Sequence, residues 1–256
     1  MIAISNIEEI LKPINDDYIW RKDEIDNLQN IQNLIDDKHL KSIFRKTQIL
    51  VLYAHYEGFF RFAFTEYANY INSIDVKLHE ALDIFLVSSL YKTFEDYDDK
   101  NNWLIKSKEG DDDKFLDKIK NRVLFVDKLK KGIEDDIVSL PVGDFREKKG
   151  LTHTKSNLDT ETAQNILYRL GLDVNLGFYN KDFMEMMGKI SQLIKDRHKI
   201  AHGDPSMKDG ISADVYIKYE ELLLSILLKI KDVVSLAIKQ KAYLKEEFRV
   251  NSNNPK

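Results

Sequence analysis

The sequence Leu50-Val-Leu-Tyr-Ala-His-Tyr-Glu-Gly-Phe-Phe60 carries the strongest fold signal of this 256-residue chain. It lies inside a helical pattern that runs from residue 38 to about residue 74. On a helical wheel the apolar residues of this segment occupy nearly every angle, and only Glu57, Arg61 and Thr65 form a polar strip. A helix that is apolar almost all round is central in a bundle or lies between subunits. The segment therefore predicts a core helix.

Composition extends the helical prediction to the rest of the chain. Glycine and proline are scarce, at 10 and 4 residues, which favours long helices. Internal repeats, a glycine-rich phosphate loop and sustained strand alternation are all missing from the sequence. Further helices are expected over residues 5–36 (with Pro13 kinking or breaking the helix), 76–94, 115–136, 160–170, 183–201 and 214–248.

These segments predict an all-α helical bundle with long central helices. We expect one helical domain over residues 1–250, in which the region 95–160 is a helical and loop elaboration, and a disordered tail over 251–256. The acidic triplet Asp111-Asp-Asp113 lacks the spaced oxygen ligands of a calcium loop and is interpreted as a solvated turn.

Charge and composition exclude several classes of protein. The absence of cysteine excludes disulfides, thiolate metal sites and a cysteine nucleophile. The first residues lack the basic and apolar regions of a signal peptide, and no apolar run reaches the ~20 residues of a membrane span. We therefore expect a soluble, cytoplasmic protein without membrane contact. A net charge of −4 disfavours a broad nucleic-acid surface but permits a small basic cleft.

The predicted helix over 183–201 is the candidate functional element. Its apolar stripe consists of Phe183, Met187, Ile190, Ile194 and Ala201. Arg197 falls in the gap of this stripe, so its guanidinium must be buried and paired, or point into a cleft or interface. His198 borders the stripe, and His202 lies one turn further on, where Gly203 and Asp204-Pro205 stop the helix.

Arginine and histidine at this place suit cleavage of a phosphodiester. Arginine offers a permanent charge and a planar fork of donors for phosphate oxygens. Histidine titrates near neutral pH and can move a proton to or from a ribose oxygen. In RNA the 2′-hydroxyl is itself the nucleophile, so neither a metal nor a cofactor is required. The structural alternative is that Arg197 satisfies the last helix carbonyls and His202 interacts with the helix dipole.

The segment Arg197-His-Lys-Ile-Ala-His-Gly203 resembles the Arg-polar-x-x-x-His motif of HEPN ribonucleases. Two further stretches are similar to the MAE-type HEPN-like nucleases of bacterial defence and toxin systems. These stretches are Leu50-Val-Leu-Tyr-Ala-His-Tyr-Glu-Gly-Phe59 and Thr154-Lys-Ser-Asn-Leu158, the second followed by a short helix that ends Leu170-Gly-Leu172. The resemblance spans the chain from about residue 40 to the last helix.

This resemblance implies a helical bundle that dimerises, brings two motifs together and cleaves RNA without a metal. Arg197 would hold the scissile phosphate, His202 would transfer the proton, and His198 would orient the substrate or the other two residues. Lys195 and Lys199 are expected to contact the RNA. The implied protein is an endoribonuclease that leaves a 2′,3′-cyclic phosphate and acts as a toxin or antiviral effector, with an antitoxin or defence-system protein as a further partner.

His55 and Glu57 are supporting candidates in the core helix. Because residues two apart point to nearly opposite sides of a helix, they cannot serve one site in one subunit. We favour a core role for His55, and expect Glu57 to pair with Arg61 or to contact the motif helix. The basic residues of 229–249 form either a solvated face or a route for the RNA backbone.

Two other functional classes are consistent with the same residues. One is a non-catalytic HEPN-like dimer that binds RNA or protein, in which Arg197 and His202 only hold an interface. The other is a structural helical subunit of a larger defence complex.

Overall fold

Helix α2 (Lys38–Ser73) is the centre of the fold in this computed structural model, which describes residues 4–98, 114–142, 150–154 and 157–251. Asp37 begins the helix by accepting a hydrogen bond from the backbone N–H of Leu40 at 2.8 Å. Buried side chains occur on most sides of α2, as the wheel predicts. They include Ile49, Leu52, Tyr53, His55, Tyr56, Phe59, Phe60, Ala63, Phe64 and Tyr67.

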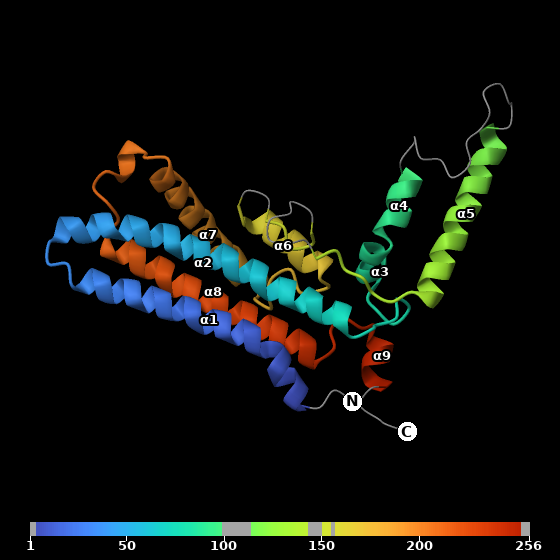
Figure 1. Ribbon diagram of the computed structural model, residues 1–256. Coiled ribbons are helices and arrows are strands. Elements are labelled where there is room, and N and C mark those ends of the chain that lie inside the picture. Colours follow the sequence, from blue (N-terminus) through green and yellow to red (C-terminus); the bar gives the residue numbers. More distant parts are fainter. Residues whose placement is uncertain (1–3, 99–113, 143–149, 155–156, 252–256) are drawn as a thin grey trace.

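The other long helices cover α2. Helices α1 (Ile4–Asn33) and α8 (Ala213–Lys239) run alongside it, and α7 (Asn180–Ala201) packs across its first half (Figure 1). The remaining helices are α3 (Asp83–Ser89), α4 (Tyr91–Asp98), α5 (Lys114–Asp135), α6 (Thr160–Arg169), the 3-10 turn η1 (Pro205–Met207) and α9 (Glu246–Asn251). The all-α prediction is confirmed: within the described ranges, extended pairing is limited to two isolated bridges.

Proline does not break the first helix. α1 continues through Pro13, and its first turns run at an angle to the rest (Figure 1). Pro13 lies on the exposed side of α1, so water can reach the carbonyl that the proline leaves without a helical N–H partner. The kink that the sequence predicts therefore occurs without a break in the helix.

The segment before α3 is not helical, contrary to the helix expected over 76–94. Leu78 N–H donates to Asp136 O at 3.1 Å, and Val138 N–H donates to Val76 O at 2.8 Å. On its other side, Lys245 N–H donates to Glu80 O at 2.9 Å. The backbone of 76–82 thus forms several of its hydrogen bonds with two distant segments, which local sequence cannot specify.

The last long helix ends earlier than the predicted Phe248. Gln240 is its C-cap, and Lys241 adopts a left-handed φ of 51°. Ala242 N–H then donates to Ala237 O at 2.8 Å, and Lys241 N–H to Ile238 O at 3.2 Å. These two bonds form a Schellman motif, which usually has glycine at the left-handed position. Because lysine occupies that position here, the sequence contained no stop signal.

Helices α4 and α5 lie beside each other and project from one end of the bundle (Figure 1). Phe125 of α5 connects them, because its ring stacks on Tyr97 at 4.4 Å and meets Phe94 edge-on at 5.7 Å. Helix α5 and the last residues of α4 fall in the region 95–160 that the sequence suggested as an elaboration. The triplet Asp111–Asp113 and residues 252–256 of the predicted tail lie outside the described residues.

None of the helices that the structure describes combines the length and apolarity needed to cross a membrane.

The turn after η1 generates a prediction about two glycines. Gly210 has a φ of 87°, and a Cβ there would lie 2.2 Å from the carbonyl oxygen of Ser42. Gly210→Ala should therefore lower the free energy of unfolding by about 2 to 4 kcal/mol, as measured by urea denaturation. The control is Gly188→Ala inside α7, where a Cβ would meet nothing within 4 Å. That change should raise the free energy of unfolding by about 0.5 to 1 kcal/mol. Equal effects of the two changes would contradict this interpretation.

Candidate functional site

The end of α7 places His202 at the surface. His202 is the C-cap of the helix, and Gly203 follows it with a left-handed φ of 68°. Asp204 N–H donates to Lys199 O at 2.9 Å, and Gly203 N–H to Ile200 O at 3.2 Å, which is again a Schellman motif. The glycine that the sequence identified as a stop signal thus ends the helix directly after the motif.

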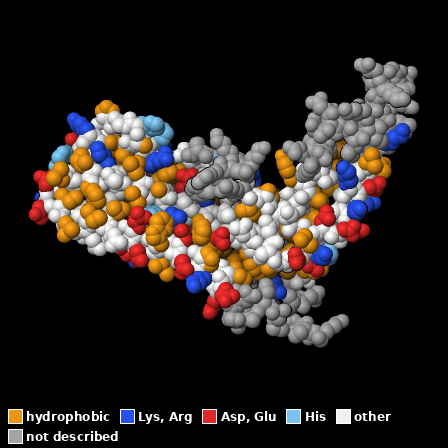
Figure 2. Space-filling model, in the orientation of Figure 1, with side chains coloured by type: hydrophobic (Ala, Val, Ile, Leu, Met, Phe, Trp, Pro, Cys, Tyr) orange, Lys and Arg blue, Asp and Glu red, His pale blue; other side chains and the backbone are white. Residues whose placement is uncertain are grey.

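The two histidines of the motif lie together on the exposed face of α7. The ring centroids of His198 and His202 are 4.3 Å apart, with an interplanar angle of 53°. Both residues are exposed, as are Lys195 and Lys199 on the same face of the helix. Figure 2 shows histidine side chains on the surface over the end of α7. This face therefore presents two imidazoles and two ammonium groups to the solvent.

Arg197 faces the opposite way, toward the core helix. Its Cζ lies 4.7 Å from the ring centroid of Tyr53 on α2, a cation–π contact. Arg197 is half-buried, in agreement with its place in the apolar stripe. Because consecutive helical residues differ by about 100°, Arg197 and His202 are separated by roughly 140° around the helix axis. One subunit therefore does not present both side chains on one face of α7.

Tyr53 joins three segments of the chain. Its hydroxyl accepts a hydrogen bond from the backbone N–H of Leu158 at 3.0 Å, while the ring faces Arg197. Burial, together with the neighbouring Glu57 carboxylate, raises the pKa of Tyr53 to about 12. The phenol is therefore neutral at physiological pH. The sequence pattern alone did not identify Arg197 as the partner of Tyr53.

Glu57 lies one turn after Tyr53 and holds the same segment. Its carboxylate accepts a short hydrogen bond from the hydroxyl of Thr154, a partner that the sequence did not predict. The two stretches 50–59 and 154–158, which resemble HEPN-like nucleases, therefore contact each other through Tyr53 and Glu57. Through Tyr53 they also meet Arg197. The three stretches that are far apart in the sequence form one site around the middle of α2.

Asp196 is a buried charge of the motif helix that the sequence did not single out. Its Oδ2 accepts from the hydroxyl of Tyr219 at 2.7 Å, and its Oδ1 accepts from Nε2 of Gln192 at 3.0 Å. Tyr219 belongs to α8, so this pair fixes the end of α7 against a second helix. Helical spacing could have predicted that Asp196 is buried, because it follows the buried Leu193 by three residues on the same face. By contrast Ala201, which the predicted stripe included, is exposed.

His55 lies on the other side of α2, against α1. Its Nδ1 is 3.4 Å from Nη1 of Arg21, which can only donate, so the neutral ring carries its proton on Nε2. That Nε2 lies 3.3 Å from Oε2 of Glu24. Burial, together with the charge of Arg21, lowers the pKa of His55 from 6.5 to about 4. The structure thus places Glu57 next to Tyr53, the residue that contacts Arg197, and His55 on the α1 side of α2.

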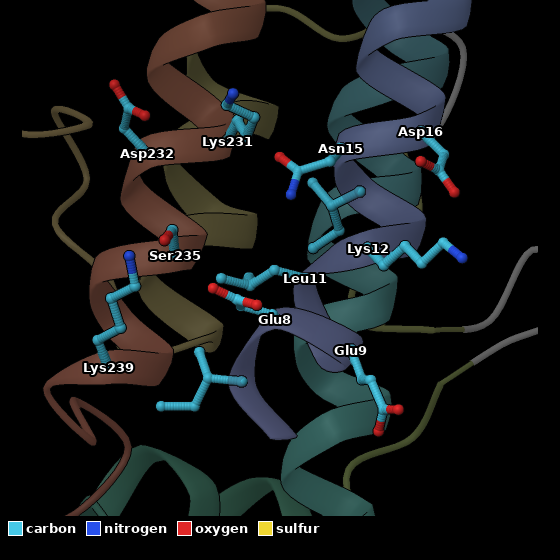
Figure 3. Close-up of a pocket in the computed structure, with 12 residues that line it drawn as sticks. Glu8, Glu9, Leu11, Lys12, Asn15, Asp16, Lys231, Asp232, Ser235 and Lys239 are labelled. Carbon is cyan, nitrogen blue, oxygen red and sulfur yellow. The ribbon is translucent and has the colours of Figure 1, made fainter. Parts of the chain in front are cut away.

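A separate cavity of about 920 Å³ lies between the first turns of α1 and the last turns of α8. Lys231, Ser235 and Lys239 of α8 face Glu8 and Asn15 of α1 across it (Figure 3). Acidic and basic side chains are therefore mixed here, so this part of the basic run over 229–249 does not form a continuous positive track. Within the described parts of the chain, no group of three or more histidine and carboxylate side chains could hold a metal ion.

The protein is thus a helical bundle in which the end of α7, with its exposed histidines and lysines, packs on the core helix α2. The sequence matches the family described as RiboL-PSP-HEPN over residues 16–236. No curated protein and no solved structure matches the chain. The protein belongs to the RiboL-PSP-HEPN family. This match confirms the resemblance to HEPN-fold nucleases that the sequence motifs indicated. This membership indicates a nuclease or an RNA-binding role.

The environment of His55 generates a prediction about pH. Because its folded pKa is below 6.5, the unfolded chain binds more protons between about pH 6.5 and 4. The stabilisation is therefore present above about pH 6.5 and is lost as the pH falls toward 4. The free energy of unfolding should fall by about 2 kcal/mol more in the wild type than in His55→Gln between pH 7.5 and 5.0. Urea denaturation at the two pH values measures this difference. Parallel losses in the two proteins would contradict the assignment.

Proposed function

We propose that this protein is a metal-independent endoribonuclease that cleaves RNA by attack of the 2′-hydroxyl and leaves a 2′,3′-cyclic phosphate. The observation that carries the proposal is the end of α7, where two histidines lie exposed in contact and Arg197 is held by Tyr53. Family membership supports an RNA-directed role.

Arg197 is suited to bind the scissile phosphate. The ring of Tyr53 covers one face of the guanidinium and restricts its rotation, while the donors at the edge of the plane stay available for phosphate oxygens. A fixed donor costs less entropy on binding than a mobile one. Tyr53 therefore acts as a positioning residue rather than a catalytic one.

His202 is the proposed proton-transfer residue, and His198 orients it. The attacking 2′-hydroxyl must lose a proton and the departing 5′-oxygen must gain one, so the reaction needs a base and an acid. The ring of His198, 4.3 Å from that of His202, restricts the orientation of His202 at the helix end. Lys195 and Lys199 on the same exposed face would attract the RNA backbone.

A homodimer would complete the site. Because Arg197 and His202 point to different sides of α7, a second copy of the chain is the simplest source of the missing partner group. Exposed apolar side chains near this end of the bundle support an interface there. They are Ile31 at 49%, Leu34 at 82% and Leu40 at 57% exposure around the turn between α1 and α2.

Substitutions in the motif test catalysis. His202→Ala and Arg197→Ala should each lower the rate of RNA cleavage by about 100-fold or more in the presence of EDTA. The wild-type products should end in a 2′,3′-cyclic phosphate, and light scattering should show that the variants keep the dimer. The matched control is His79→Ala, because His79 is an exposed histidine outside the motif.

The second candidate function is a non-catalytic dimer that binds RNA or protein, and the packing of Arg197 on Tyr53 is the observation that favours it. In that case wild type and His202→Ala would show the same background cleavage. Arg197→Ala would then weaken the fold or the dimer.

Two substitutions of Tyr53 test its positioning role. Tyr53→Phe keeps the ring under Arg197 but removes the acceptor of the Leu158 N–H, whereas Tyr53→Leu removes both. A cation–π contact contributes on the order of 1 kcal/mol, so kcat should fall about fivefold further in Tyr53→Leu than in Tyr53→Phe. KM should change little between them. Equal kcat values would show that the ring does not position Arg197.

The biological setting that we propose is a toxin or antiviral effector in the cytoplasm, neutralised or triggered by a partner protein. The support is the resemblance of the motif stretches to nucleases of such systems. Induced expression in bacterial cells should arrest growth for the wild type and not for His202→Ala. Growth that is equal for both proteins would count against a toxic role.

A further inference from the structure

The outer face of α7 carries a stripe of side chains that runs from the motif back to the start of the helix. At about 100° per residue, its members lie within about 60° of His202 around the helix axis. The motif end of the stripe, with its histidines and lysines, belongs to the proposed site. The first half of the stripe has no role in that site and consists of Lys181, Met184, Gly188 and Ser191.

The carboxylates of α7 lie on another side of the helix. Asp182, Glu185 and Asp196 are about 100° or more from the centre of the stripe. Asp196 is buried in its hydrogen bond with α8. Nζ of Lys189 lies 2.8 Å from Oε1 of Glu185, and this bond is the main cause of the lowered pKa of Glu185, to which Lys181 contributes only slightly. The stripe therefore presents cations with no carboxylate of α7 among them.

The ammonium groups of the stripe stand at its two ends. Lys195 and Lys199 are exposed at the motif end, and Lys181 is exposed at the other. The pKa of the nearby Asp204 is lowered mainly by hydrogen bonds from Ser206 and only slightly by Lys199. In a chain with a net charge of −4, such a local row of cations is the kind of surface that binds a phosphate backbone.

The middle of the stripe is open to close approach. A Cβ at Gly188 would meet nothing within 4 Å, so the helix backbone is uncovered there. The hydroxyl of Ser191 donates back to the carbonyl oxygen of Met187 at 2.9 Å and does not project outward. Met184 is 60% exposed, and its flexible thioether offers apolar surface to a ribose or a base. A chain that binds the lysines at both ends can therefore lie against the helix between them.

The shape of the stripe favours a single strand of nucleic acid over a duplex. It is one helix wide and about 30 Å long, which suits the roughly 4 to 16 nucleotides that single-strand-binding folds cover. Tyr179, the N-cap of α7, is 85% exposed directly before the stripe begins. An exposed aromatic ring stacks on an unpaired base, whereas the bases of a duplex are already stacked on each other.

We infer that this stripe of α7 is the track for a single strand of RNA on one side of the scissile phosphate. The inference deepens the proposed function and rests on it for the choice of RNA. The strand leaves the motif at His202 and follows α7 toward Lys181. It thereby runs away from the turn between α1 and α2, where the second copy is proposed to dock (Figure 1). The predicted target is a single-stranded region of RNA.

Charge changes at Gly188 test the track in the full-length protein. The probe is a single-stranded RNA with 2′-O-methyl riboses, which this chemistry cannot cleave, and fluorescence anisotropy over a range of KCl concentrations gives its affinity. Gly188→Lys should raise the affinity about fivefold and steepen the slope of log affinity against log salt by about 0.7. Gly188→Glu should lower the affinity about fivefold. Gly188→Gln measures the effect of bulk alone and should lie between them.

The opposite signs separate a local effect from damage to the fold, because a misfolded variant would not bind more tightly. The matched control is the same pair of charge changes at Asn27, an exposed residue of α1 on the other side of α2 from α7 (Figure 1). Asn27→Lys and Asn27→Glu should leave the affinity and the slope at the wild-type values. Equal effects at the two positions, or no effect at Gly188, would overturn the inference.

Strandedness is tested by annealing the probe to its complement. Tyr179→Ala should weaken binding of the single strand about tenfold and leave binding of the duplex unchanged. A duplex that binds as tightly as the single strand, with the same dependence on Gly188, would show that the assignment to a single strand is wrong.

The outcomes for this inference and for the proposed nuclease are separable. A wild type that cuts no RNA but shows the predicted changes at Gly188 would defeat the nuclease and leave the track standing. A wild type that cuts RNA in the expected way, with equal affinities in Gly188→Lys and Gly188→Glu, would do the reverse.

Discussion

The requirement to cover α2 on all sides governs the whole structure. An apolar helix of this length exposed to water would be strongly unfavourable, so α1, α7, α8 and the segment before α6 each bury part of its surface. The same burial favours a hydrogen-bond partner for the polar groups on α2, and several of them have one. The partners come from different segments: Tyr216 bonds Gln48, Leu158 bonds Tyr53, Thr154 bonds Glu57 and Thr152 bonds Thr65. The polar groups of α2 therefore select which segments lie against which face, and in doing so they assemble the candidate site.

The long helices were predictable because their signals are local. Asp159 caps α6 by accepting from Thr162 N–H at 2.8 Å, and Gly171 follows that helix with a φ of 63°, which are local start and stop signals. Two boundaries were not predictable for physical reasons. Lys241 takes a left-handed conformation without glycine, and residues 76–82 form backbone hydrogen bonds with segments far away in the sequence. Tertiary contacts override local preference at both places.

The candidate site was predictable in its parts but not in its geometry. The gap in the apolar stripe located Arg197 against the core, and Gly203 located His202 at a helix end. Spacing could not reveal that Tyr53 receives Arg197, because that contact depends on how α7 crosses α2. Nor could it reveal Asp196 as the residue that ties the motif helix to Tyr219. Both contacts link residues on different helices, so neither has a signature within one helical period.

The segment that carries Thr152, Thr154 and Leu158 is attached to α2 through side-chain hydroxyl groups, without a strand or helix of its own over 150–154. Such an attachment opens at a smaller free energy than the bundle unfolds. Opening would remove the hydrogen bonds to Tyr53 and Glu57 while leaving α1, α2 and α8 packed. The surroundings of the motif would thus have a sub-global equilibrium of their own, which any ligand that binds one of the two forms more tightly can shift.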